Sequence, residues 1–144
     1  MRRLRDDSGS TLPLVIFYGF LALALVLIVA AASSLYLERK RLFTLADDAA
    51  LVGAESFDLD SVTFTAHGPR PVLQPAQVHA AVMSYVVGNP IDEFEGLVVT
   101  RATTVDGESA TVTVSAVWHP PVVTVFVPGG MRIDATAVAR SVFG

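Results

Sequence analysis

Residues 12–32 read LPLVIFYGFLALALVLIVAAA, an apolar run of 21 residues without a charged side chain. A helix rises about 1.5 Å per residue, so this run would extend about 30 Å, the thickness of the hydrocarbon core of a bilayer. Basic residues flank it on both sides, namely Arg2, Arg3, Arg5, Arg39, Lys40 and Arg41. The sequence therefore predicts a transmembrane helix over residues 12–34.

A cleavable secretory signal is the main alternative, because Ala30, Ala31, Ala32 and Ser33 offer small side chains for a cut after Ala32. The apolar region of such signals is roughly 7–15 residues long, which is shorter than this run. A retained, single-pass anchor is therefore favoured over cleavage.

Charge and composition narrow the function classes. Three basic residues stand on each side of the anchor, so the charge rule does not orient it. Beyond residue 32 the chain carries seven basic and twelve acidic side chains, and such a balance gives no affinity for nucleic acid. The absence of cysteine excludes disulfides and thiolate metal sites. The roughly one hundred residues after the anchor suffice for one small domain.

The helix is predicted to continue past the membrane to about Glu55, with Thr11 as its N-cap. An apolar stripe with spacings typical of a helix runs along this continuation and comprises Leu35, Leu42, Leu45, Ala49 and Val52. Polar residues are expected on the other side, at Glu38, Lys40, Arg41, Thr44 and Asp48. Residues 35–56 are thus expected to be amphipathic, and their apolar face needs a cover.

Three strands are predicted in the second half of the chain. Apolar residues alternate with polar ones over residues 110–118, which is typical of a half-buried strand. Residues 97–104 form the preceding strand, and Asp106-Gly107 marks a tight turn between the two. Residues 131–140 alternate in the same way. The three are expected to pair antiparallel.

The segment between the long helix and these strands gives weaker signals. Residues 61–66 are a weak strand candidate, ended by His67-Gly68-Pro69. Residues 75–87 predict a short helix with an apolar face, stopped by Gly88-Asn89-Pro90. The predicted fold class is α+β: a long transmembrane helix that continues into a domain (residues 57–144) with an antiparallel sheet of three or four strands, one short helix, and helices on one face.

Three local patterns resemble a known family. Residues 6–14 (DDSGSTLPL) place acidic residues and a glycine before the apolar run, and residues 42–54 (LFTLADDAALVGA) form an aspartate- and alanine-rich stretch that closes on glycine-alanine. The chain ends with a strand, a short apolar segment at 122–127, a turn at Gly129-Gly130 and a last alanine-rich strand. These patterns resemble the TadE/TadG-like proteins of bacterial Flp (tight-adherence) pilus assembly, whose architecture is similar to that of pilins and pseudopilins.

The resemblance implies a location and a set of partners. Residues 1–11 would lie in the cytoplasm, and residues 35–56 and 57–144 outside the bacterial plasma (inner) membrane or in a surface pilus. The partners would be the lipid bilayer, other pilins or pseudopilins and pilus-assembly proteins, acting through helix packing in the bilayer and sheet contacts outside it. No enzymatic activity and no cofactor are implied.

The departures from type IV-like pilins refine this expectation. Such pilins are cut after a glycine and carry a glutamate five residues beyond the cut, which makes Gly9 and Ser10 the candidate processing site. Leu14 stands where that glutamate would be, so the chain lacks the charge that would pair with a neighbouring subunit's amino terminus. This argues against processing at Gly9 and against a bulk filament subunit, and favours a minor pilin or pseudopilin.

The anchor and the family-like stretch provide the candidate structural or subunit contacts: Leu14, Gly19, Leu42, Leu45, Asp47, Asp48, Ala49, Val52 and Gly53. Gly19 and the alanines of the anchor allow close helix packing, although ordinary membrane-helix composition explains them equally well. Asp47 and Asp48 point about 100° apart on a helix, so they cannot form a carboxylate dyad. One of them is expected to bond to the domain or to a neighbouring subunit.

No catalytic or metal constellation is visible. His67, His79 and His119 lack glutamate or cysteine at ligand spacing. The acidic groups at Asp58 and Asp60 and at 92–95 (Asp92, Glu93 and Glu95) lack the spacing of a calcium loop, so solvated loop charge is the better interpretation.

The proline-bracketed apolar segment 118–128 has two interpretations, a buried connector or edge strand, which is favoured, and an edge that binds a partner or touches the membrane. Two function classes follow: a pilus-assembly or minor-pilin protein, and a generic membrane-anchored extracytoplasmic binding or sensing domain.

Overall fold

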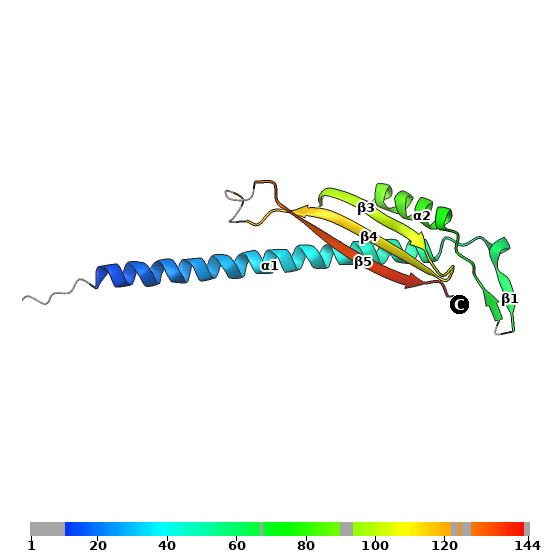
Figure 1. Ribbon diagram of the computed structural model, residues 1–144, viewed down its shortest axis with the longest axis horizontal. Coiled ribbons are helices and arrows are strands. Elements are labelled where there is room, and N and C mark those ends of the chain that lie inside the picture. Colours follow the sequence, from blue (N-terminus) through cyan, green and yellow to red (C-terminus); the bar gives the residue numbers. More distant parts are fainter. Residues whose placement is uncertain (1–10, 67, 90–93, 122–123, 125–127, 143–144) are drawn as a thin grey trace, which may run out of the picture.

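The computed structural model describes residues 11–66, 68–89, 94–121, 124 and 128–142. It contains a long helix, α1 (Leu12–Ala54), a short helix, α2 (Pro75–Gly88), and a 3-10 turn, η1 (Leu59–Ser61). The strands are β1 (Thr63–Thr65), β2 (Gly68–Arg70), β3 (Glu95–Thr104), β4 (Ser109–Trp118) and β5 (Met131–Arg140). The predicted α+β fold, with a long apolar helix, a three-stranded antiparallel sheet and a short helix, is confirmed (Figure 1).

Helix α1 is one continuous rod whose first half projects away from the sheet (Figure 1). It begins after Thr11, as predicted, although the Thr11 side chain makes no capping hydrogen bond. It ends at Ala54, one residue before the predicted end. The large apolar side chains between Leu12 and Val29 that are exposed are 53% to 75% accessible. The helix has the length and composition to cross a membrane.

The sheet has the order β3-β4-β5, and both pairs are antiparallel. The β4–β5 register is regular over all ten residues, from Ser109 opposite Arg140 to Trp118 opposite Met131. The β3–β4 register shifts twice near the start of β3, where Gly96 has a positive φ of 59°. All three strands lie within two residues of their predicted starts because their alternating patterns are long and clean.

Both helices cover the same face of this sheet. Helix α1 packs on β4 and β5, and α2 packs on β3 and on α1. Alternate residues of β4 point into the resulting core, and all of them are buried: Ala110, Val112, Val114, Ala116 and Trp118. The predicted half-buried strand is therefore confirmed, with the sheet lying over the second half of α1 (Figure 1).

The buried stripe of α1 agrees with the predicted one only in part. Leu35, Leu45 and Val52 are only half-buried. The buried residues of the helix are instead mostly small, namely Leu42, Ala46, Ala49, Ala50, Gly53 and Ala54. Leu42 and Ala49 of the predicted stripe are thus confirmed as core residues, whereas Leu35, Leu45 and Val52 are not. The other buried positions are small because α1 lies close against both the sheet and α2.

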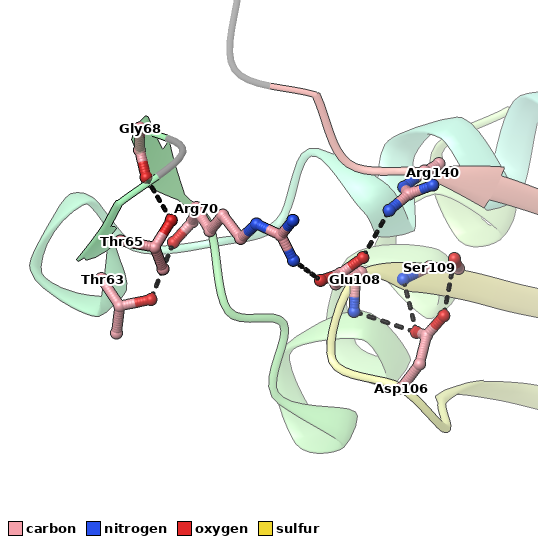
Figure 2. Close-up of polar contacts among 8 residues, drawn as sticks. All are labelled: Thr63, Thr65, Gly68, Arg70, Asp106, Glu108, Ser109 and Arg140. Carbon is pink, nitrogen blue, oxygen red and sulfur yellow. Dashed lines mark hydrogen bonds and ion pairs between the residues drawn. The ribbon is translucent and has the colours of Figure 1, made fainter.

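The segment after η1 also differs from the prediction. The strand covers only residues 63–65, and Gly68 and Pro69 do not end it but belong to β2, which pairs back on β1 with Thr65 opposite Gly68. Gly68 has a φ of 108°, which favours glycine. Residue 67 lies outside the described residues. This hairpin is joined to the turn between β3 and β4 by Arg70, whose Nη1 lies 2.7 Å from Oε1 of Glu108 (Figure 2).

Candidate assembly surface on the long helix

The predicted contact residues in the first half of α1 are uncovered. Leu14 is 57% accessible. A Cβ atom on Gly19 would meet nothing within 4 Å. All residues from Leu12 to Leu23 are exposed, and in Figure 1 this half of the helix projects away from the sheet. This half of the helix therefore presents a surface that only lipid or another apolar helix can cover.

Three of the predicted residues lie in the domain core instead. Leu42 and Ala49 are 0% accessible, and Gly53 is buried. A Cβ atom on Gly53 would lie 3.2 Å from side-chain atoms of Ala110, Val78 and Val82. These residues hold the helix to the sheet and to α2.

Asp47 and Asp48 are both exposed. Within the part of the chain that the structure describes, neither carboxylate forms a hydrogen bond or an ion pair. They point in different directions from the helix, in agreement with the 100° between neighbouring residues. Two carboxylates are thus presented to solvent on the part of α1 that packs on the sheet.

Asp48 belongs to a groove between α1 and α2. The groove has a volume of about 380 Å³, and its lining consists of Arg41, Thr44, Leu45, Asp48, Tyr85, Asn89 and Phe94. Burial, and secondarily the negative charge of Asp48, raises the pKa of Tyr85. The phenol therefore stays neutral and can donate a hydrogen bond, beside one cationic and one anionic side chain. The half-buried Leu45 gives the groove an apolar floor.

A second, smaller depression lies on α1 just past the apolar run. Its volume is about 270 Å³ and its lining residues are Tyr36, Arg39, Lys40 and Phe43. The two rings are 68% and 51% accessible, respectively. Exposed aromatic rings beside two cations form an amphipathic surface at the point where the helix leaves the apolar segment.

The remaining sequence candidates lie elsewhere. His79 is exposed, whereas His119 lies 3.1 Å from Glu95, measured from Nδ1 to Oε2. Asp58 accepts a hydrogen bond from the Gln77 side chain. In the described ranges no three His, Asp or Glu side chains come together as a metal site. His67, Asp92 and Glu93 lie outside those ranges.

The last residue of β4 makes a contact that the sequence patterns do not predict. The indole Nε1 of Trp118 lies 3.3 Å from Oγ of Ser34 and donates a hydrogen bond to it. Trp118 is 8% accessible, and Pro120 is buried. These flanking residues are thus buried, while the apolar segment 122–127, apart from Thr124, lies outside the described residues.

Comparison with known proteins adds one positive result. Searches of curated proteins and of solved structures found no match. The candidate processing site, Gly9 and Ser10, lies outside the described residues. The segment that matches a family model begins at residue 9 and covers all of α1. This segment makes up one third of the chain. Residues 9–56 match the putative Flp pilus-assembly TadE/G-like family, which confirms the resemblance seen in the sequence.

Proposed function

We propose that the protein is a non-enzymatic, membrane-anchored component of a Flp-type (type IV-like) pilus assembly machine, in the role of a minor pilin or pseudopilin. The observation that carries this proposal is the coincidence of the family match, residues 9–56, with helix α1, Leu12–Ala54. The family match thus covers helix α1. The first half of this helix is apolar and exposed, and the second half packs into the core of the domain.

The two halves of α1 would have different roles. In the bilayer a helix satisfies its own backbone hydrogen bonds, so residues 12–34 can serve as an anchor and pack against helices of other pilins. Leu14 leaves this segment without a buried charge, so its packing would depend on shape, with Gly19 as a point of close approach. The second half positions the sheet.

The groove between α1 and α2 supports a contact with a neighbouring subunit. It offers an apolar floor at Leu45 and charges of both signs at Arg41 and Asp48. Asp47 stands beside it without an intramolecular partner among the described residues. Exposed charges that make no internal pair are suited to selecting a partner and fixing its register.

Assembly in cells tests this role. Deletion of the gene should abolish or greatly reduce Flp pili seen by electron microscopy, and re-expression of the wild-type chain should restore them. The Asp47→Arg/Asp48→Arg variant should fold but fail to restore pili, because it reverses the charges at the groove. Asp134→Arg, on the exposed side of β5, is the matched control and should restore them. Normal pili in the deletion strain would contradict the proposal and favour a free-standing binding or sensing domain.

The proposed location places residues 1–11 in the cytoplasm and the rest of the chain after the anchor outside the plasma membrane. The chain has no cysteine, so a single introduced cysteine can be labelled specifically. Val138 is 60% accessible, so a cysteine in the Val138→Cys variant should react with a membrane-impermeant maleimide in spheroplasts. If labelling requires lysis of the spheroplasts, the domain lies in the cytoplasm and the proposed orientation is wrong.

The mature amino terminus tests the role within the machine. Because Leu14 replaces the glutamate that type IV-like pilins carry beyond their cut, we expect mass spectrometry to find an uncut Gly9–Ser10 bond. Quantitative cleavage after Gly9 would show that processing does not need that glutamate, and would favour incorporation into the filament.

A further inference from the structure

One end of the sheet, where β4 ends and β5 begins, lies beside the point where α1 leaves its apolar run. We define the proximal end of the sheet as Trp118, His119, Gly130 and Met131. Trp118 donates its indole hydrogen bond to Ser34, and it stands opposite Met131 in the β4–β5 register. Figure 1 shows this end of β4 and β5 alongside the middle of α1, while the turn between β3 and β4 lies toward the other end of the helix.

The geometry sets the depth of the proximal end relative to the bilayer. The apolar run ends at Ala32, so Ser34 lies about 3 Å beyond it along the helix axis. The headgroup layer adds roughly 5–7 Å on each side of the hydrocarbon core. Neighbouring strands are about 4.8 Å apart, so Met131 is close to Trp118 and at a similar level. A helix that spans the membrane with residues 12–32 thus brings the proximal end to the headgroup layer.

The chemistry of the proximal end suits that layer. Met131 is 53% accessible although it is apolar. Among the described residues, two charged side chains at this end have partners: Glu95 pairs with His119, and Arg132 donates to the hydroxyl of Ser115 at 2.8 Å from Nη1 to Oγ. Residues 119–130, which join β4 to β5, include no Asp, Glu, Lys or Arg. The ring of Trp118 is itself buried and bonded to Ser34, so it fixes this end of the sheet to α1, and Met131 is the large apolar side chain that the end exposes.

We infer that the proximal end of the sheet is a second, peripheral lipid-binding surface, which rests in the membrane–water interface beside the transmembrane helix. The inference rests on the proposed anchoring of residues 12–34. A helix alone lets a domain tilt and rotate over the membrane. A second contact, at the end of a sheet packed on the same helix, would fix the angle of the domain, and with it the direction of the groove between α1 and α2.

Single-site labelling of the full chain in liposomes tests this inference. The environment-sensitive fluorophore NBD is attached to Met131→Cys, Val138→Cys or Leu23→Cys, whose wild-type residues have similar accessibilities of 53%, 60% and 55%. Val138 is the matched control, because it lies on the same strand about 23 Å from Met131 at 3.3 Å per residue. Leu23 reports on the anchor. Quenchers are a lipid with a nitroxide near the headgroup and aqueous iodide, and the near-ultraviolet circular dichroism of Trp118 verifies folding.

We expect the nitroxide lipid to quench the label at 131 several-fold more than the label at 138, with the opposite order for iodide. If the label at 131 behaves like that at 138 while the label at 23 is quenched by lipid, the anchor stands and the second lipid contact is wrong. If the label at 131 is shielded from iodide but also escapes the lipid quencher, it faces another protein copy, which overturns the inference as well. If the label at 23 escapes the lipid quencher, the proposed anchoring itself fails.

Discussion

Gly53 of α1 and Val82 of α2 are so close that a Cβ atom on the glycine would lie 3.2 Å from Cγ2 of the valine. The same Cβ atom would also approach Ala110 of β4 at 3.2 Å. Helices α1 and α2 and strand β4 therefore meet at Gly53, where the side chain has room only for a hydrogen atom. The end of the long helix is built into the domain, which is the arrangement that makes α1 its spine.

A larger side chain at this position should loosen the domain. Gly53→Leu should destabilise it by about 1–3 kcal/mol, because overpacking a closed core exceeds the gain of about 1 kcal/mol from replacing glycine in a helix. Gly88→Leu is the matched control, since a Cβ atom there meets nothing within 4 Å. Urea unfolding in detergent micelles, followed by Trp118 fluorescence, measures both. Equal effects of the two variants would contradict the close packing at Gly53.

The contact between Trp118 and Ser34 should contribute modestly to the attachment of the sheet. Ser34→Ala should cost about 0.5–1.5 kcal/mol, the usual net value of one hydrogen bond. Trp118→Phe removes the same donor, so the double variant should lose less than the sum of the two single losses. A double-mutant cycle on urea unfolding, read by circular dichroism, checks this. Strict additivity would mean that the hydrogen bond is not formed.

Asp106 should make the domain sensitive to acid. Hydrogen bonds from the backbone N–H groups of Glu108 and Ser109, and then from the Ser109 hydroxyl, lower the pKa of this carboxyl from 3.8 to about 2 (Figure 2). Since the folded pKa is below the unfolded one, the unfolded chain binds more protons near pH 3. The stabilisation is complete above about pH 4 and is lost as the pH falls through about 2.

Replacement of Asp106 tests that linkage. Asp106→Asn keeps an acceptor oxygen for the two backbone N–H groups but does not titrate. The difference in stability between wild type and Asp106→Asn should therefore shrink as the pH is lowered from about 5 to about 2. Thermal unfolding across that range measures it. Parallel curves for the two proteins would show that the pKa of Asp106 is the same in the folded and unfolded chains.

Glu108 should couple the β1–β2 hairpin to the sheet. Its two carboxylate oxygens lie 2.7 Å from Arg70 and 2.6 Å from Arg140 (Figure 2). The two arginine side chains are 52% and 68% accessible and the Glu108 side chain is 33% accessible, so water screens both pairs. Glu108→Gln should therefore cost only about 0–1 kcal/mol per pair, and less at high salt. Its clearer effect should be faster amide hydrogen exchange in the hairpin, residues 63–70, with little change in β4.

The control for that experiment is Asp134→Asn, which removes an exposed carboxylate from β5. It should leave exchange in the hairpin unchanged. Faster exchange throughout the domain in Glu108→Gln would mean that the ion pairs act on global stability, which contradicts a local coupling.

The sequence predicted the long helix and the three long strands within two residues, because an apolar run and strict alternation are properties of neighbouring residues. It missed the small-residue interface at Ala46 and Ala50, since the proximity of two elements has no signature in hydrophobic spacing. The hairpin was half recognised, because Pro69 reads as the end of a strand although an edge strand accepts it.

The candidate site was predictable only in part. Residues 42–54 resembled the family through local composition, and the family match confirmed that resemblance. The groove between α1 and α2, and the bond from Trp118 to Ser34, join residues far apart in the chain. Such pairs depend on the register of the sheet against the helix, which a single sequence does not encode in any short pattern.

The central claim is that one helix is both a lipid anchor and the spine of the domain. Washing membranes of expressing cells with alkaline carbonate tests it most directly. The full chain should remain in the membrane pellet until detergent is added, and near-ultraviolet circular dichroism of the detergent-solubilised protein should show Trp118 in a fixed environment. Release of the intact, folded chain by carbonate alone would contradict the claim.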